Sequence, residues 1–243
     1  MVNSMKFYDL HVQSNLSGGE NTIEQIVDFA KKLGYTGIAI CDNYQGLEKL
    51  NELKNEINKV KTDIEVYLGV NIQTQDVKEL KDMISKVREK VMIVIASGGD
   101  YSINRAACED PRVDILSHPE AGRIDSGLDQ PCLELATQNN VAIQINFREI
   151  VYSFRRPRSY ILNHITKNIR MCNHFRTPMI ICSGAQNIWD MRAPRELISI
   201  ANVLGMDIGK AFLSISSVPI EIVENNKKTL EGKKITEGVE IVE

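Results

Sequence analysis

The sequence lacks the marks of an oxidised, secreted or membrane-spanning protein. Its 243 residues include five cysteines, an odd number, and no two of them have the spacing of metal ligands. No apolar run approaches the roughly 18 residues that a membrane-spanning helix needs, and the N-terminal residues lack the charged-then-apolar pattern of a signal peptide. Each cysteine lies in or beside an apolar run, which predicts reduced, buried thiols in a cytoplasmic protein: Cys41, Cys108, Cys132, Cys172 and Cys182.

The sequence also lacks a strong charge of either sign. Its net charge is −3 at pH 7, and 43% of its residues are hydrophobic and 25% charged, as is ordinary for a soluble globular protein. This balance argues against a uniformly basic nucleic-acid binder, so any RNA-binding surface must be local. The length of 243 residues is close to the roughly 250 residues of a (β/α) barrel with one large core.

Seven short, mostly apolar segments alternate with stretches of helical periodicity. Strands that are buried on both faces of a parallel sheet have this composition. In the first helical stretch, Thr22 followed by Gln25 predicts a capping box, and Gly34 predicts the helix end. The predicted strands are residues 6–11, 36–42, 65–72, 91–96, 113–117, 141–146 and 178–183.

This alternation predicts either a closed barrel or an open, doubly wound sheet. Seven units without a domain break favour a (β/α) barrel, so we expect residues 1–243 to form a single (β/α)-barrel domain. No eighth strand is evident, because residues 206–220 indicate short helices or one irregular strand. The segment from about residue 225 to residue 243 is charged, and we expect it to fray.

Polar residues follow the predicted strands, at the end of a parallel barrel where active sites form. The first strand ends in DLH, the second in CDN and the fifth in SHP. The residues His11, Asp42 and His118 predict one of two arrangements. They form a metal site, built from imidazole and carboxylate ligands on different strands, or they belong to a polar cap that is hydrogen-bonded internally.

These motifs resemble those of the polymerase-and-histidinol-phosphatase (PHP) superfamily, whose members are distorted seven-stranded (β/α) barrels that bind up to three metals. In this resemblance, His11, Asp42 and His118 stand at ligand positions. Five further ligand positions carry other residues: Gln13, Asn43, Asn71, Gly184 and Gln186. Four of these are neutral amides, which lack the charge or imidazole nitrogen of a tight divalent site. The resemblance implies a vestigial metal site, and it leaves weak residual metal binding open.

Within that fold, the chain is similar to the 30-kilodalton subunit family of ribonuclease P. The resemblance runs from Phe7 to about Ala211 and is carried, in order, by FYDLHVQS, by NRAA ahead of VDILSHPEAGR, by AIQINFREI and by ICSGAQNIWDMRAPREL. It implies a subunit that stabilises a catalytic RNA in removing the 5′ leader from precursor tRNA. It also implies a small ferredoxin-like protein partner and other ribonuclease P proteins, no cofactor, and no catalytic residue on this chain.

Residues 148–176 form a locally basic segment. They contain seven positive residues and one acid, Glu149, for a net charge of +6, whereas the other 214 residues together carry −9. This asymmetry favours a phosphate-binding surface over an ordinary solvated face, and Tyr152, Phe154 and Tyr160 are suited to stack on unpaired bases. The RNA-binding residues predicted in this segment are Arg148, Arg155, Arg156, Arg158, Lys167, Arg170 and Arg176.

Three more arginines join this prediction if the barrel places them on the same face. Arg105 and Arg123 flank the fifth strand, and Arg192 follows the seventh. In the same region, Trp189 is the only tryptophan, and we expect it to anchor core packing.

Two alternative functions compete with the RNA-binding subunit. The first is a metal-dependent phosphoesterase of the PHP type, which the missing ligands oppose. The second is an unrelated barrel enzyme, which would require a carboxylate or a lysine at the mouth. Asp42 is the only mouth acid that the sequence suggests, and a structural hydrogen-bonding role suits it better.

Overall fold

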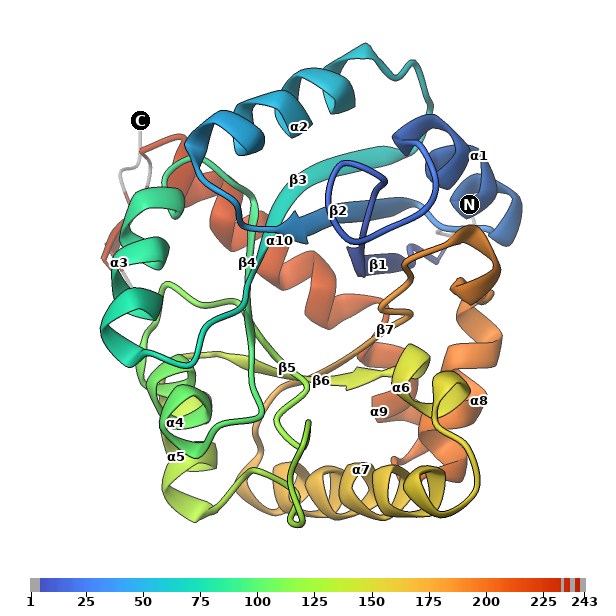
Figure 1. Cartoon of the computed structure of the whole chain (residues 1–243), viewed down its shortest axis with the longest axis vertical. Coiled ribbons are helices and arrows are strands. Elements are labelled where there is room, and N and C mark those ends of the chain that lie inside the picture. The colour runs from blue at the N-terminus through green and yellow to red at the C-terminus, as the bar shows by residue number, and fades with distance from the viewer. Residues whose placement is uncertain (1–4, 233, 237–238, 241–243) are drawn as a thin grey trace.

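Seven parallel strands form the centre of the protein (Figure 1). The computed structural model describes residues 5–232, 234–236 and 239–240. Each strand begins and ends within two residues of the predicted bounds. Strands that follow one another in the sequence are hydrogen-bonded side by side. The strands are β1 (Tyr8–Val12), β2 (Gly37–Asn43), β3 (Glu65–Ile72), β4 (Ile93–Ser97), β5 (Ile115–Ser117), β6 (Ala142–Asn146) and β7 (Met179–Cys182).

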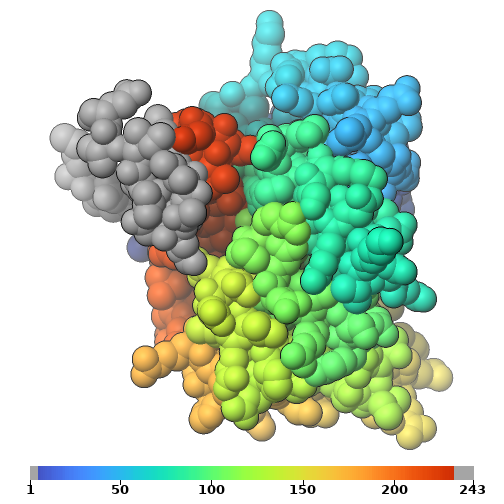
Figure 2. Space-filling view, turned by 90° about the vertical axis from the view of Figure 1, so that its left-hand side faces the viewer, coloured from blue at the N-terminus to red at the C-terminus, as the bar shows by residue number. Residues whose placement is uncertain are grey.

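Helices follow the strands and cover the outside of the barrel. The capping box of Thr22 and Gln25 is present, and Gly34 ends the first helix in the left-handed conformation with φ 87°. Figure 2 shows α3, α4 and α5 side by side, with α7 below them. The helices are α1 (Ile23–Leu33), α2 (Leu47–Lys59), α3 (Val77–Val87), α4 (Tyr101–Glu109), α5 (Gln130–Gln138), α6 (Phe147–Tyr152), α7 (Arg156–Phe175), the 3-10 helix η1 (Ile188–Asp190), α8 (Pro194–Val203), α9 (Ile208–Leu213) and α10 (Ser217–Leu230).

The gap between β1 and β7 is filled by the short link between α9 and α10. The N–H of Tyr8 on β1 donates to the carbonyl of Ile215 at 3.0 Å, and the N–H of Ile181 on β7 donates to the carbonyl of Ser214 at 3.2 Å. One isolated bridge joins the two strands directly near their carboxyl ends. The predicted fold is confirmed as a nearly closed (β/α) barrel, and residues 206–220 prove to be helices around this link.

The side chain of Asp9 reinforces the same seam. Each of its carboxylate oxygens accepts a hydrogen bond from the N–H of Ser183, just after β7, at 3.3 Å. One oxygen also accepts from the N–H of His11 at 3.3 Å. Asp9 is completely buried, and this burial raises its pKa to about 6. The carboxyl group therefore ties β1 to β7 where few backbone bonds do so.

Helix α10 closes the end of the barrel at which the strands begin. It contacts β1, β4 and β7 (Figure 1), and Val223 packs inside the barrel. Asn226 donates to the carboxylate of Asp114 at 2.8 Å. The segment expected to fray from about residue 225 is thus helical as far as Leu230. A short antiparallel pair follows, β8 (Lys234–Thr236) and β9 (Val239–Glu240), and the rest of the expected tail lies outside the described residues.

Candidate functional site

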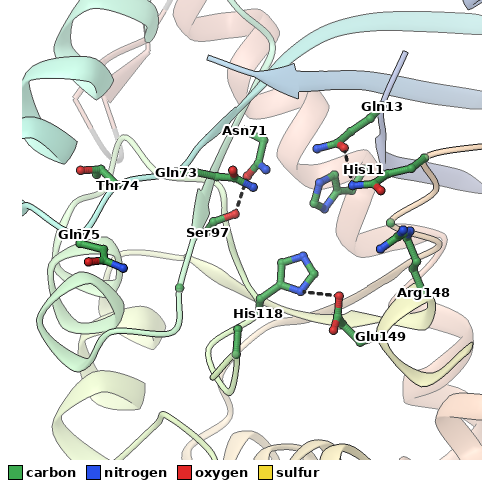
Figure 3. Close-up of a pocket in the computed structure, with 14 residues that line it drawn as sticks. His11, Gln13, Asn71, Gln73, Thr74, Gln75, Ser97, His118, Arg148 and Glu149 are labelled. Carbon is green, nitrogen blue, oxygen red and sulfur yellow. Dashed lines mark hydrogen bonds and ion pairs between the residues drawn. The ribbon is translucent and has the colours of Figure 1, made fainter. Parts of the chain in front are cut away.

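A cavity of about 520 Å³ opens where the strands end (Figure 3). This is the end of a parallel barrel at which binding sites form. Amide, imidazole, hydroxyl, guanidinium and carboxylate groups line it. They belong to His11, Gln13, Asn71, Gln73, Thr74, Gln75, Ser97, His118, Arg148, Glu149 and Gln186.

Both histidines of the cavity are held neutral. Nδ1 of His11 lies 3.0 Å from Oε1 of Gln144, and Nε2 of His118 lies 3.1 Å from Nδ2 of Asn146. Burial lowers the pKa of each imidazole to about 4, and nearby positive charge adds to this effect, from His118 on His11 and from Arg148 on His118. The two rings stand edge to face with centroids 6.1 Å apart.

The third ligand-type residue, Asp42, does not join them. Its two oxygens accept hydrogen bonds from the backbone N–H and the hydroxyl of Ser14, each at 2.6 Å. Burial raises the pKa of this carboxyl group, although both bonds from Ser14 oppose the shift. Asp42 therefore anchors the loop after β1, the structural role that suits it better.

The amides that stand at the other ligand positions bond to one another. Gln186 donates to Gln13 at 3.0 Å, and Gln13 donates to Asn43 at 3.1 Å. Asn71 donates to the same oxygen of Asn43 at 2.9 Å and accepts from the hydroxyl of Ser97 at 3.0 Å. We call these five side chains the amide chain. Their hydrogen-bonding groups largely satisfy each other, as the polar-cap interpretation predicts.

The residues at the mouth do not fit the metal cluster of the PHP superfamily. In the described part of the chain, no three His, Cys, Asp or Glu side chains converge to hold a metal ion. Apart from Arg148 and Glu149, the groups that do converge are amides, imidazoles and hydroxyls, and most are already hydrogen-bonded to protein neighbours. A site for a tight divalent ion requires anionic or free imidazole ligands. That the chain binds no metal stays a prediction.

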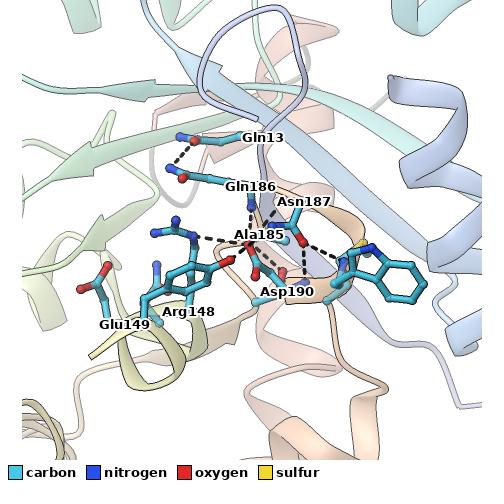
Figure 4. Close-up of polar contacts among 12 residues, drawn as sticks. Gln13, Arg148, Glu149, Ala185, Gln186, Asn187 and Asp190 are labelled. Carbon is cyan, nitrogen blue, oxygen red and sulfur yellow. Dashed lines mark hydrogen bonds and ion pairs between the residues drawn. The ribbon is translucent and has the colours of Figure 1, made fainter. Parts of the chain in front are cut away.

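Two acids near the mouth were not predicted from the sequence. Glu149 lines the cavity, and its carboxylate lies 3.5 Å from Nδ1 of His118, so the expectation that Asp42 is the only mouth acid is wrong. Asp190 belongs to η1 and lies 3.4 Å from Nε of Arg148 (Figure 4). The position of Glu149, three residues after β6 ends, is the signal that would have found it.

Arg148 is fixed at the rim of the cavity. Its guanidinium lies over the ring of Tyr152, 4.1 Å from the centroid. The hydroxyl of Tyr152 accepts a hydrogen bond from Asn187 at 3.2 Å. This predicted RNA-binding residue, which lines the mouth, is thus held in place by Tyr152 of its own helix, α6, and by Asp190 of η1.

The remaining positive residues of the segment lie along α7, between its N-cap Arg155 and its C-cap Arg176. Six exposed residues of α7, four and three positions apart, share one side of the helix, and α7 contains no Asp or Glu. We call this side the basic face of α7. It consists of Arg156, Tyr160, Asn163, Lys167, Arg170 and His174.

Arginines and aromatic rings alternate where α7 begins. The guanidinium of Arg155 lies 5.2 Å from the centroid of Phe154, and that of Arg156 lies 5.7 Å from the centroid of Tyr160. Both rings are at least half exposed. Arg158 has a different role, because its side chain donates to the carbonyls that end α6, at 2.8 and 3.1 Å.

Four predicted residues lie outside the start of α7 and its basic face. Arg176 ends α7 at its far end, which the 20 residues of the helix place about 30 Å from its start. Arg105 is exposed on α4, and Arg123 is paired with Asp125 at 2.6 Å.

Arg192 lies beside α6. It donates to two backbone carbonyls at 2.6 and 2.8 Å, and its guanidinium lies 5.1 Å from the centroid of the Phe147 ring. That all ten residues form one RNA-binding surface stays a prediction.

The prediction that Trp189 anchors the core is wrong. Its side chain is 73% exposed and meets the ring of Phe29 edge to face, with centroids 5.9 Å apart.

The fold and the mouth define a seven-stranded (β/α) barrel whose mouth is rich in neutral amides and imidazoles and whose outer helix α7 is basic. The chain matches the family described as RNase P subunit p30 over residues 6–230. Ribonuclease P protein component 3 of Methanosarcina barkeri is 32% identical over 238 residues, covering 98% of this chain and 96% of the relative. The same component of Methanococcoides burtonii is 33% identical over 237 residues, covering 98% and 94%.

Solved structures agree with this assignment. A chain in the cryo-EM structure of archaeal ribonuclease P with mature tRNA superposes with a TM-score of 0.80 at 28% identity, covering 97% of this chain and 98% of that one. The histidinol phosphate phosphatase of Lactococcus lactis gives a TM-score of 0.55 at 13% identity, covering 84% and 95%, and shows the fold alone.

The chain therefore belongs to the RNase P subunit p30 family. This confirms the predicted function as a protein subunit of ribonuclease P, the tRNA-processing ribonuclease, and places its partners among the components of that complex. Within the residues that the structure describes, no helix is long and apolar enough to cross a membrane.

Proposed function

We propose that the chain binds the ribonuclease P RNA through the start of α7 and the basic face of α7, and so stabilises the catalytic RNA. The observation that carries this proposal is a helix of 20 residues with positive side chains along one exposed side and no acid of its own. Phosphate contacts by such a helix neutralise the RNA backbone where RNA helices crowd together.

The start of α7 supplies the best-suited groups. Arg155 and Arg156 are exposed, and each is stacked on an aromatic ring without an acidic partner in the described residues. A guanidinium can contact a phosphate with two parallel hydrogen bonds. The exposed rings of Phe154 and Tyr160 offer faces for unpaired bases.

The contribution of this chain to the reaction is binding. The catalytic groups lie on the RNA, and precursor tRNA meets this chain indirectly through the complex. A small ferredoxin-like subunit and other ribonuclease P proteins are its protein partners. Five buried cysteines without disulfides suit a reducing cytoplasm. The alternative, a PHP-type phosphoesterase, lacks a ligand set at the mouth.

The decisive test combines Arg155→Ala with Arg156→Ala and measures binding of ribonuclease P RNA over a series of salt concentrations. We expect affinity to fall roughly tenfold or more, and the salt slope to flatten by about 1.4 to 1.8, because two phosphate contacts are lost. Lys54→Ala with Lys78→Ala removes two exposed charges from α2 and α3 and serves as the matched control.

Equal binding by the two double variants would overturn the proposed surface. Arg158 is left intact in this test, because its bonds to the end of α6 would mix folding with binding. Cleavage of precursor tRNA by the reconstituted complex, with and without this chain, gives the functional readout. Metal analysis of the purified chain addresses the phosphoesterase alternative.

A further inference from the structure

The cavity at the mouth is asymmetric in its chemistry (Figure 3). Arg148 lies on one side, and the amides of Gln73 and Gln75 lie on the opposite side, in the loop after β3. A volume of about 520 Å³ falls within the roughly 300–1,000 Å³ of small-molecule sites. The cavity therefore has room for a ligand with an anionic end and a hydrogen-bonding end.

Arg148 has N–H groups left for an anion. Its buried Nε faces the carboxylate of Asp190 at 3.4 Å, whereas its two terminal nitrogens make no hydrogen bond within the described residues. The carboxylate of Asp190 is shared, because the same oxygen also accepts the N–H groups of Gln186 and Asn187 at 3.2 and 3.3 Å. A guanidinium held over the ring of Tyr152, 4.1 Å from its centroid, can offer these terminal N–H groups to a phosphate.

The opposite wall offers free amides. The side chains of Gln73 and Gln75 are exposed and have no hydrogen-bond partner in the described structure. A primary amide carries both donors and an acceptor, and this combination recognises the edges of nucleobases. The acid of the cavity, Glu149, lies beside His118, and burial raises its pKa.

The floor beneath the histidines also has unmet hydrogen-bonding groups. Gln144 is 4% exposed and its Nε2 has no partner, and Asn146 is 2% exposed and its Oδ1 has none. Each of these amides supports one of the two neutral imidazoles that line the cavity. A donor and an acceptor thus lie unpaired directly below a site built of neutral groups.

We propose that the mouth cavity binds a single unpaired nucleotide, with its phosphate on Arg148 and its base against Gln73 and Gln75. The source of the nucleotide is the RNA that the chain binds, so this proposal rests on the proposed function. Arg148 opens the same basic segment as Arg155 and Arg156, and an RNA strand that follows the segment reaches the cavity at its rim.

The first experiment uses the isolated chain. Titration with AMP, CMP, GMP, UMP and inorganic phosphate, followed by amide NMR, should shift the side-chain signals of Gln73 and Gln75 with each nucleotide. Arg148→Gln should weaken nucleotide binding by about tenfold, the effect of losing one charge-assisted bidentate contact. Arg195→Gln, at an exposed position of α8, is the matched control and should change nothing.

The double variant Gln73→Ala with Gln75→Ala distinguishes recognition of the base from recognition of the phosphate. It should weaken nucleotide binding and leave inorganic phosphate binding as it is. Absence of nucleotide binding at the mouth, or equal binding by Arg148→Gln, would overturn the proposal. Because Arg155→Ala with Arg156→Ala should bind AMP normally while losing affinity for RNA, a failure of the cavity is distinguishable from a failure of the RNA surface.

A second experiment identifies the source. With p-benzoylphenylalanine in place of Gln73, irradiation of the complex with ribonuclease P RNA should cross-link one unpaired nucleotide, and Arg148→Gln should abolish that cross-link. In the complex of the unmodified chain with ribonuclease P RNA, free AMP should not bind, because the nucleotide of the RNA already occupies the cavity. If AMP binds the complex as well as the isolated chain and no cross-link forms, the cavity takes a free nucleotide and the RNA source is refuted.

Discussion

The two ends of the barrel differ in how buried ionisable side chains are accommodated. At the end closed by α10, Arg88 and Asp114 are 11% and 9% exposed and form an ion pair of 2.8 Å. Arg88 also donates to three backbone carbonyls, and Asn226 donates to Asp114. Charge at this end is kept and fully paired, as a buried ion pair requires.

At the open end, burial instead shifts ionisable groups toward their neutral forms. It lowers the pKa of His11 and His118 to about 4, and it raises that of Asp9 to about 6 and that of Glu120 to about 7. A neutral group can be buried beside a cavity without a charged partner, whereas burying an unpaired charge costs much more free energy. The comparison teaches that the mouth relies mainly on hydrogen bonds between neutral groups, with Arg148 and Asp190 as its partly buried ion pair.

This difference fixes the direction of pH dependence. The lowered histidine pKa values stabilise the fold above pH 6.5, and this contribution is lost as the pH falls toward 4. The raised pKa values of Asp9 and Glu120 contribute stability that is complete below their ordinary values of 3.8 and 4.5. It is lost as the pH rises through about 6 and about 7.

The largest effect is expected at the closed end. Arg88→Met should lower the free energy of unfolding by about 3–5 kcal/mol, because it leaves the carboxylate of Asp114 buried without its partner. Urea unfolding followed by circular dichroism measures the change. Lys90→Met removes an exposed charge two residues away and should be nearly neutral. Equal effects of the two substitutions would remove the distinction between the ends.

Asp9→Ala should destabilise the barrel by about 2–4 kcal/mol, because it leaves the buried N–H groups of His11 and Ser183 unpaired at the seam. Asp9→Asn keeps an acceptor and should cost less. It should also remove the part of the pH dependence that lies between pH 4 and pH 6. Thermal unfolding at several pH values tests both statements, and an unaltered pH profile in Asp9→Asn would contradict them.

Glu120→Gln should stabilise the protein at pH 8 by up to about 3 kcal/mol, because a raised pKa means that ionisation opposes folding. The gain should vanish at pH 4, where Glu120 is protonated in both states. Melting temperatures at the two pH values provide the measurement. Glu89→Gln, at an exposed site, is the control. A gain of equal size at both pH values would point to packing rather than ionisation.

The smallest effect is expected in the amide chain. Gln13→Ala should cost about 1 kcal/mol, because its partners Gln186 and Asn43 border a cavity where water replaces the lost bonds. A double-mutant cycle with Asn43→Ala should give a coupling of roughly 0.5–1 kcal/mol. Strict additivity of the two substitutions would show that the amides do not act as a chain.

Much of the fold could be predicted from the sequence, because buried parallel strands are short apolar runs with polar ends. The ends of β3 were predicted to the residue. Residues 206–220 could not be assigned, because the link at Ser214 and Ile215 pairs with β1 and β7 through its carbonyl groups. Such pairing needs no particular side chain and leaves no periodicity.

The site was predictable in its residue types but not in its contacts. The substitutions at Gln13, Asn43 and Asn71 indicated a neutral mouth, and the structure joins them by hydrogen bonds. The charge pattern of the sequence could not show that the side chains of Arg158 and Arg192 donate to backbone carbonyls. Trp189 was expected to anchor the core as the only tryptophan of the chain, but residue type alone does not decide which side of a loop a side chain faces.

The link that fills the seam ties the first strand of the chain to its last helices. During synthesis, β1 leaves the ribosome about 10 to 40 seconds before residues 214–216, at common elongation rates of about 5–20 residues per second. Throughout that interval, the N–H groups at the edge of β1 have no strand or link to accept them, and such an edge invites pairing with other chains. The nascent protein therefore depends on α9, α10 and the link between them to become a finished barrel, and a chain truncated before α9 is expected to aggregate rather than fold.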